Sequence, residues 1–206
     1  MTFPGCIIKY LIGLKKYNSI GEENLRVISG KAGGLRLKSL EGIATRPTAD
    51  RIKESLFNII DPIIGEAQVL DLFAGTGALG IEALSRGAKF ATFVDSNRQS
   101  ISVIKYNLEH TRLIQAAEVY MNDYHSAVKK LSELGRRYDI VFIDPPYGKG
   151  LEYKAVKMLI NFDILVNNSI IIIENEQKDV LPDKLYTAVK VDRREYGRTA
   201  ISFYKE

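Results

Sequence analysis

The sequence predicts an α/β fold, built on a doubly wound, Rossmann-like sheet that is mostly parallel with one antiparallel C-terminal strand. Three observations predict it. Short apolar segments typical of buried strands alternate with segments whose apolar residues recur at helical spacing. A glycine-rich turn at residues 74–80 separates the first strand of this series from its helix. Two further segments flank Gly197 near the C-terminus and are typical of a closing hairpin.

The first elements precede the alternating series. Residues 26–29 and 35–40 are typical of two strands, and the glycine-containing stretch between them predicts a hairpin with a loop rather than a tight turn. A helix is then expected from Thr48, which can cap it. Its apolar residues fall on one face, and we expect it to end before Pro62.

The alternating series follows, with each element bounded by a polar or glycine-containing turn. The expected strands lie at residues 68–73, 90–94, 118–121, 138–143 and 169–173. The expected helices lie at 78–86, 97–111, 123–134 and 151–160, and the closing hairpin pairs 185–192 with 199–204. Because crossovers between parallel strands are right-handed, the loops after the strands gather at the carboxyl edge of the sheet.

These elements divide the chain into three expected regions. Residues 1–24 are an extension outside the core, residues 25–61 form the small hairpin and helix, and residues 62–206 form the main domain. No internal repeat or low-complexity tract interrupts them.

Composition narrows the class of protein. The 206 residues are 46% hydrophobic and 26% charged, as in an ordinary soluble globular protein. A single cysteine, Cys6, excludes an intramolecular disulfide, and no Cys/His cluster has zinc-ligand spacing. No segment is long and apolar enough to span a membrane, and no secretory signal is evident. We therefore expect a cytoplasmic protein without a metal or a membrane partner.

The net charge of +4 is unevenly distributed. Basic residues outnumber acidic ones between residues 26 and 60, and a second basic group, Arg193, Arg194 and Arg198, lies near the C-terminus. Phosphate groups are natural partners for such patches. A solvated charged surface is the alternative explanation.

The glycine-rich turn predicts a nucleotide-like cofactor. Gly75, Gly77 and Gly80 match G-x-G-x-x-G between a strand and a helix, a fingerprint that nicotinamide dinucleotide sites share. Asp71 favours S-adenosylmethionine, because a carboxylate here can meet the cationic amino-acid end of that molecule and would repel a pyrophosphate. The alternative is an Asp that only stabilises the turn.

Two further positions fit a nucleoside. Asp95 ends the second strand of the series, where a carboxylate can accept both ribose hydroxyls. Asp123, with Asn122 beside it, follows the third strand and could accept a hydrogen bond from the adenine amine. Asp123 could equally cap the next helix, or do both.

The tetrapeptide Asp144-Pro145-Pro146-Tyr147 predicts the catalytic site. The Asp144 carboxylate and the Pro145 carbonyl could accept hydrogen bonds from a planar amine, which favours a pyramidal nitrogen with its lone pair directed at a methyl group. Consecutive prolines fix the backbone that carries both acceptors. Tyr147 offers a ring on which a base can stack, worth about 1–3 kcal/mol. The alternative is a proline-stiffened turn without chemistry.

With these motifs the chain resembles the RsmD-type methyltransferases, which modify the guanine N2 amine in small-subunit (16S) ribosomal RNA of bacteria. The resemblance runs from about Leu25 to the C-terminus. Its carriers are the stretches at residues 26–31, 46–48, 50–58, 71–77 and 144–147. The stretch from Arg46 to Asn58 is the most specific, since the last two occur throughout amino methyltransferases.

The resemblance implies a Rossmann-like methyltransferase sheet with S-adenosylmethionine as cofactor and ribosomal RNA, within a small subunit or its assembly intermediate, as partner. The loop of Asp71, Phe73, Gly75, Thr76 and Gly77 would hold the methionine part. Arg46 and Thr48 would lie over the cofactor. Asp95 would bind the ribose, although the family usually has Glu there. The residues expected to contact RNA are Lys31, Arg36, Arg46, Arg51 and Arg198.

The N-terminus departs from the family, whose members typically begin with Met where this chain has Leu25. We therefore expect Leu25 to mark a start codon other than AUG. An intact Met1 on the protein isolated from its native cell would contradict this.

Other functions remain open from the residues alone. One is methylation of adenine N6 in DNA or RNA, although the chain has no room for a sizeable DNA target-recognition domain. Another is methylation of an amide nitrogen in a protein, for which Asn in place of Asp144 is more typical. A third is a non-catalytic RNA-binding assembly factor, against which the intact acceptor motif argues.

Overall fold

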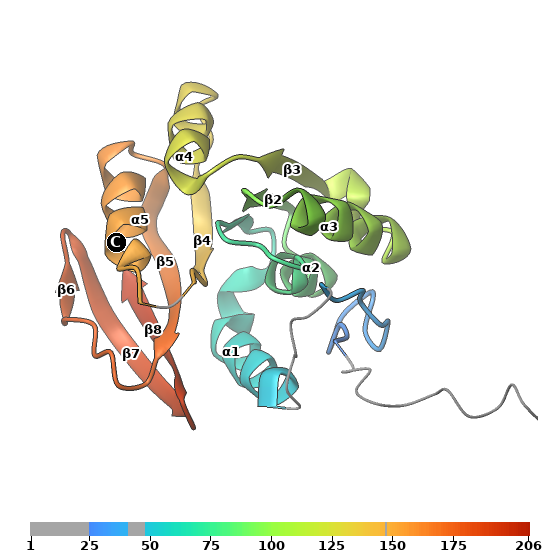
Figure 1. The fold of residues 1–206 in the computed structure, drawn as a ribbon, viewed down its shortest axis with the longest axis horizontal. Coiled ribbons are helices and arrows are strands. Elements are labelled where there is room, and N and C mark those ends of the chain that lie inside the picture. The colour runs from blue at the N-terminus through green and yellow to red at the C-terminus, as the bar shows by residue number, and fades with distance from the viewer. Residues whose placement is uncertain (1–24, 41–47, 147) are drawn as a thin grey trace, which may run out of the picture.

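A computed structural model describes residues 25–40 and 48–206 with the exception of Tyr147, and its centre is an eight-stranded sheet. The strand order is β3-β2-β1-β4-β5-β8-β7-β6 (Figure 1). The strands are β1 Gln68–Asp71, β2 Phe90–Asp95, β3 Ala117–Met121, β4 Tyr138–Ile143, β5 Leu165–Glu176, β6 Lys184–Leu185, β7 Ala188–Tyr196 and β8 Thr199–Lys205.

Helices cover both faces of this sheet (Figure 1). They are α1 Thr48–Ile64, α2 Ala78–Ser85, α3 Arg98–His110, α4 Tyr124–Glu133 and α5 Leu151–Asn161. One apolar cluster joins α1, α2 and α3 to the sheet, and a second joins α4 and α5 to its other face. The predicted doubly wound α/β fold is therefore confirmed.

The five strands β1 to β5 pair in parallel, as the alternation of strands and helices predicted. β8 runs antiparallel to β5 and is the predicted antiparallel strand. Two more strands, β7 and β6, extend the sheet beyond it. Because β1 to β5 are parallel, the loops after them share one carboxyl edge, and this edge carries the residues of interest below.

Element boundaries agree with the sequence in most places and differ in a few. α1 does not end before Pro62 but continues through it to Ile64. Ile64 is almost fully buried in the core, and this packing outweighs the hydrogen bond that a proline cannot donate in the last turn. β5 is much longer than expected. Its first half is polar, has few paired residues and shows no alternation of apolar residues, so the sequence did not indicate it.

Two short elements were not predicted, the 3-10 helix Ile114–Ala116 and strand β6. The N-terminal hairpin is real but minimal. It has a single antiparallel bridge, between Arg26 and Arg36, rather than two full strands. Backbone hydrogen bonds such as Val27 N–H to the Leu35 carbonyl (2.9 Å) complete it. Residues 1–24, the expected extension, lie outside the described residues, whereas Leu25, the expected start, is described and buried.

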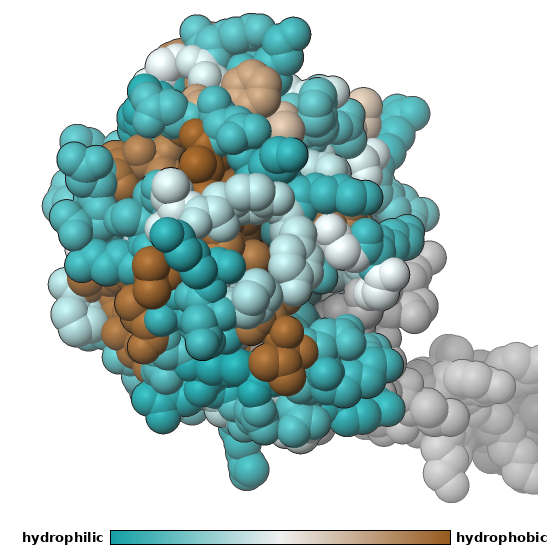
Figure 2. All heavy atoms as spheres, turned by 90° about the vertical axis from the view of Figure 1, so that its left-hand side faces the viewer, coloured by the Kyte–Doolittle hydropathy of each residue, from teal (hydrophilic) through white to brown (hydrophobic). Residues whose placement is uncertain are grey.

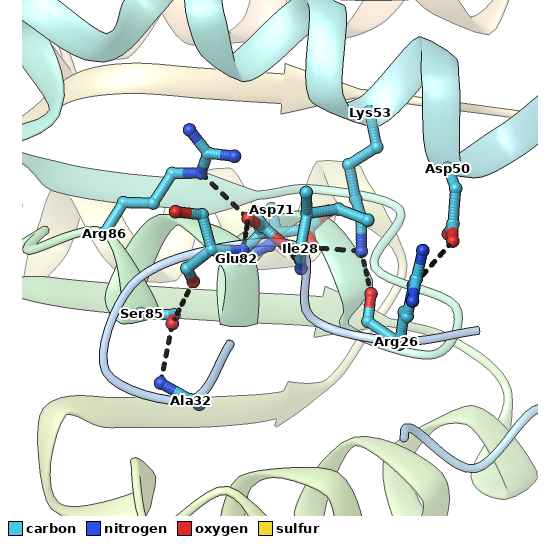
Figure 3. A network of polar contacts seen from close by, with 11 residues as sticks. Arg26, Ile28, Ala32, Asp50, Lys53, Asp71, Glu82, Ser85 and Arg86 are labelled. Atoms are coloured by element: carbon cyan, nitrogen blue, oxygen red, sulfur yellow. Dashed lines mark hydrogen bonds and ion pairs between the residues drawn. The ribbon is translucent and has the colours of Figure 1, made fainter. Parts of the chain in front are cut away.

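A buried carboxylate fastens this hairpin and α1 to α2. Glu82 has no exposed surface, and its oxygens accept from the backbone N–H groups of Ile28 (2.7 Å) and Ser29 (3.0 Å) (Figure 3). It also pairs with Arg86 Nε at 2.8 Å and Lys53 Nζ at 3.3 Å. Lys53 in turn donates to the Arg26 carbonyl. Three segments far apart in the chain therefore converge on one side chain.

The opposite end of the sheet carries β6 and β7. Figure 2, which faces α5, β6 and β7, shows apolar patches scattered among hydrophilic atoms. Val180, Val189 and Val191 are the strongly exposed valines of this end.

Candidate active site

The loop after β1 turns sharply into α2 and is held by Asp71. The Asp71 carboxylate, which is 2% exposed, accepts from the Gly80 N–H at 3.0 Å. Gly77 has a left-handed backbone (φ 77°), which favours glycine. A Cβ on Gly80 would lie 2.3 Å from the Phe93 ring, so helix and sheet can pack this closely only at a glycine. The turn-stabilising role of Asp71, considered above as an alternative, is therefore present.

The Asp95 carboxylate lies against the same loop. Its Oδ2 accepts from the Gly75 N–H at 2.9 Å, and its Oδ1 accepts from the Asn97 N–H at 2.7 Å. Gly75 also has a left-handed backbone (φ 54°), and a Cβ there would meet nothing within 4 Å. The loop backbone at Gly75 is therefore open to a neighbouring ligand, with a carboxylate beside it.

Burial changes the acidity of Asp71. Desolvation raises the pKa of Asp71 to about 7, the hydrogen bond from Gly80 opposes this, and the charge of Asp95 adds to it. A cationic group at this edge would lower that pKa again. The site therefore favours a positively charged partner.

Asp144 and Pro145 follow β4 directly at the carboxyl edge. Asp144 is exposed at the surface, so a substrate can reach it, while Pro145 is buried. Although the residue as a whole is exposed, the protein atoms around its carboxyl group partly desolvate that group and raise the pKa of Asp144 well above its usual range, and the charges of Glu174 and Asp71 act in the same direction. Pro146 is exposed, and Tyr147 lies outside the described residues.

Glu174 is a residue that the sequence analysis did not identify. Ile143 pairs with Ile173 in the parallel ladder of β4 and β5, so Asp144 and Glu174 are the next residues on neighbouring strands. The available signal was its position directly after the expected strand 169–173, the same signal that identified Asp95.

The positions predicted near the adenine and the methionine part have structural partners. The Asp123 side chain caps α4 by accepting from the Ser126 N–H at 3.0 Å, which bears out the capping alternative, and this hydrogen bond lowers the pKa of Asp123. The Asn122 N–H donates to the Asp95 carbonyl (3.1 Å). The Phe73 ring lies against Tyr124, with centroids 5.7 Å apart.

The remaining loop positions are less informative. The Thr76 carbonyl accepts from the Asn107 side chain at 2.9 Å, which ties the loop to α3. Thr48 is the first residue of α1, but its side chain, like all of Arg46, lies outside the described residues.

The residues predicted to contact RNA are exposed wherever the structure describes them. Lys31 and Arg36 lie on the N-terminal hairpin, Arg51 lies on α1, and Arg198 lies in the turn between β7 and β8. The structure does not gather all four in one place.

It does bring together the two basic groups of the sequence. A cavity of about 660 Å³ lies between α1 and the end of β7. Its lining comprises Arg51, Glu54, Ser55, Asn58 and Ile59 from α1 and Arg194, Glu195 and Tyr196 from β7. A hydrogen bond between the Ser55 and Tyr196 hydroxyl groups, 141 residues apart, joins its walls. We call this cavity the α1–β7 groove.

The groove and the carboxylates share one row across the sheet. Glu174 on β5 pairs with Ile201 on β8, and Ile201 pairs with Arg194 on β7. With Asp144 beside Glu174, the row runs from the β4 loop to an arginine of the groove. Since neighbouring strands lie about 4.8 Å apart, the two sites are close enough for one extended ligand.

Among the described residues, no group of three or more His, Cys, Asp or Glu side chains could hold a metal ion. Within the same part of the chain, every helix is too short or too polar to cross a membrane.

Comparison with known proteins gives consistent results. The family described as "Conserved hypothetical protein 95" matches residues 25–205. A Bacillus subtilis protein named "Putative rRNA methyltransferase YlbH" is 39% identical, over 88% of this chain and 99% of its own length. The "Ribosomal RNA small subunit methyltransferase D" of Escherichia coli is 37% identical, over 82% of this chain and 83% of its own.

A solved structure agrees with these sequences. "Putative methyltransferase yhhF from Escherichia coli" superposes with a TM-score of 0.78 and 30% identity, and the match covers 89% of this chain and 98% of that one. The extent and identity of these matches show that the chain belongs to the Conserved hypothetical protein 95 family, which is the RsmD family.

Proposed function

We propose that this protein transfers a methyl group from S-adenosylmethionine to the N2 amine of a guanine in small-subunit ribosomal RNA. The observation that carries the proposal is the position of Asp144, which follows β4, the strand next to the Asp71 strand, at the sheet edge where the glycine loop lies. An amine acceptor and a cofactor loop are thereby adjacent. The names of the relatives above support RNA of the small subunit as the substrate.

The residues of the glycine loop fit S-adenosylmethionine. Gly75 leaves open space where any other residue would carry a side chain, and the carboxylates of Asp71 and Asp95 flank it. Asp71 is suited to the cationic amino-acid end, and Asp95 to the ribose hydroxyls. When bound, the cofactor supplies an electrophilic methyl group on a good leaving group.

The chain's own residues then act on the amine. Asp144 and the Pro145 carbonyl accept hydrogen bonds from the N2 hydrogens, which orients the nitrogen and concentrates its lone pair. N2 would form its bond to the methyl carbon as the carbon–sulfur bond of the bound cofactor breaks, and the proton that N2 loses would pass to Asp144 or to water. Because the leaving group is already good, orientation supplies most of the acceleration.

The α1–β7 groove supports RNA as the substrate. It offers two arginines, Arg51 and Arg194, for phosphate and polar side chains for base edges. The row of paired residues from Arg194 through Ile201 to Glu174 connects the groove to Asp144. A strand lying in the groove could therefore present a flipped guanine to the β4 loop, at a cost of a few kcal/mol for unstacking.

The test is to map methylated nucleosides in ribosomal RNA from cells with and without this protein. We expect one N2-methylguanosine to be lost from small-subunit RNA when the protein is absent, and the purified protein to restore it with S-adenosylmethionine. Loss of a methyladenosine, or methyl incorporation only into protein, would contradict the proposal.

The Asp144→Ala variant tests the acceptor role. We expect transfer to fall by about 100-fold or more, because the variant lacks the group that orients the amine, with cofactor affinity nearly unchanged. Single-turnover rates and calorimetric binding measure the two quantities. Unchanged transfer would remove Asp144 from the mechanism.

A further inference from the structure

Glu174 is placed to contact the substrate alongside Asp144. The two residues directly follow the paired Ile143 and Ile173 on neighbouring parallel strands. Neighbouring strands lie about 4.8 Å apart, and residues in register point their side chains to the same face. The alternation from Phe142 and Ile172, both in the apolar cluster under α1, puts this face on the α1 side of the sheet.

Glu174 is partly exposed at the carboxyl edge of the sheet, beside Asp144. On β8 its partner is Ile201, which is buried and apolar, and on β4 its neighbour is the exposed Asp144. The two carboxylates therefore lie side by side at the edge of the sheet, where Asp144 meets solvent. A pair of carboxylates accepts two hydrogen bonds from a ligand with two adjacent donors.

Guanine has such an edge. Its N1–H and its N2 amine are neighbouring donors on one edge of the base. Adenine instead has an N6 donor next to an N1 acceptor. The lone pair of that N1 would point at a lone pair of the second carboxylate, which is repulsive. A second carboxylate beside the amine acceptor thus favours guanine and disfavours adenine.

We propose that Glu174 accepts a hydrogen bond from the N1–H of the target guanine while Asp144 accepts one from its N2 amine; this inference rests on the proposed function. Glu174 then determines the specificity for guanine. Neither the motif at residues 144–147 nor the glycine loop provides this discrimination, because both acceptors in the motif serve the amine.

A chemical double-mutant cycle tests it. The substrate RNA is prepared with guanine or with 2-aminopurine at the target position, the latter keeping the 2-amine but lacking the N1–H. Each RNA is assayed with wild type, Glu174→Ala and Glu174→Gln. The preference for guanine is measured as the ratio of kcat/KM values for the two RNAs and, separately, as the ratio of their Kd values. The Kd ratio can be measured even for a variant whose methyl transfer is very slow. Glu176→Gln, two residues along the same strand, is the matched control.

We expect wild type to prefer guanine by roughly 10- to 100-fold, the range for a hydrogen bond to a charged group. Glu174→Ala should reduce the preference to about 2-fold or less, because the N1–H then has no partner. Glu174→Gln should be intermediate, since its amide oxygen still accepts, and Glu176→Gln should retain the wild-type ratio.

The failures are distinguishable. If wild type methylates no guanine, the proposed function fails. If wild type methylates guanine but its preference over 2-aminopurine is absent, or persists in Glu174→Ala by both measurements, only the role of Glu174 is refuted. If Glu174→Ala only destabilised the fold, methylation of both RNAs would fall by the same factor. The preference for guanine would then be unchanged, and this result also contradicts the proposed role of Glu174.

Discussion

The observed role of Asp71 in the turn and its proposed role toward a cation place opposite demands on its carboxylate. It accepts from the Gly80 N–H and so fixes the turn that opens α2, yet its burial penalises the charged form that would bind a cation. Asp95 and Asp144 lie at the same edge and repel that charge further. The edge is thus an arrangement of carboxylates whose mutual repulsion a cation bound there would relieve.

This arrangement predicts how stability depends on pH. The folded pKa of Asp71 is about 7 and its ordinary value is 3.8, so the folded chain holds this proton more tightly than the unfolded chain does. Stability is therefore lost as the pH rises through that window, by up to about 4 kcal/mol. Asp71→Asn, which keeps an acceptor for Gly80 and does not titrate, should exceed wild type in free energy of unfolding at pH 8 but not at pH 4.

Urea denaturation without cofactor at both pH values measures the difference. Asp139→Asn is the control, because the Asp139 carboxylate also accepts a backbone N–H (from Gln68, 2.7 Å) but lies in β4 near the opposite edge of the sheet. If the free energies of unfolding of Asp71→Asn and wild type differ by the same amount at both pH values, the raised pKa of Asp71 is contradicted.

At the residue scale, the sequence predicted those carboxylates that lie where a strand gives way to a loop within a recognisable motif. Asp71, Asp95 and Asp144 met that condition. Glu174 also follows an expected strand but belongs to no recognisable motif, and its place beside Asp144 depends on the pairing of β5 with β4, which is a property of the folded sheet. The capping role of Asp123 was local and therefore visible in the sequence.

At the scale of elements, Glu82 decides whether the N-terminal hairpin and α1 stay on the core. It satisfies two backbone N–H groups of the hairpin and pairs with Lys53 of α1 and Arg86 (Figure 3). Burial lowers the pKa of Lys53, and the Glu82 charge opposes that effect. Since α2 begins at the glycine loop, one residue links that loop, proposed to hold the cofactor, to the elements proposed to hold RNA.

Glu82→Ala should therefore destabilise the protein by about 3–5 kcal/mol, because the buried Lys53 and two backbone N–H groups would lose their hydrogen-bonding partner. Glu118→Ala, which breaks a partly exposed pair with Arg136, is the matched control and should cost under about 1 kcal/mol. Chemical denaturation measures both. Amide exchange of residues 27–37 should accelerate in Glu82→Ala, and equal stability of the two variants would show that Glu82 is not the anchor.

Elements with strong local signals were predicted within a residue or two, and those shaped by tertiary contacts were not. β4 matches its expected bounds, because an apolar run between turn residues defines it locally. α1 passes Pro62 since the core rewards the burial of Ile64. The hairpin is reduced to one bridge because Glu82, not a neighbouring strand, satisfies the N–H groups of Ile28 and Ser29.

At the scale of the whole molecule, the fold joins two basic groups that the sequence keeps apart. Arg51 comes from α1 and Arg194 from β7, and both line the α1–β7 groove. The sequence predicted each group separately but could not predict their meeting, which depends on β7 lying two strands from β5 at the far side of β8. Arg194 also pairs with Asp192 at 2.9 Å, a surface contact that phosphate can replace.

Arg51→Ala and Arg194→Ala should each weaken RNA binding about equally for different RNA sequences and reduce the slope of log K against log salt by about 0.7 to 0.9, the value for one phosphate contact. Filter binding at several salt concentrations measures the slope. Arg137→Ala is the matched control, since Arg137 is also exposed and paired with a surface carboxylate, Asp163, but precedes β4 at the opposite edge of the sheet.

The double variant distinguishes a shared groove from two independent surface charges. If one RNA strand lies in the groove, each arginine positions the strand for the other, so the combined loss should differ from the sum of the single losses by more than about 0.5 kcal/mol. Additive losses with unchanged slopes would instead mean that RNA approaches Asp144 from another side, and the exposed Lys31 and Arg36 of the hairpin would be the next positions to substitute.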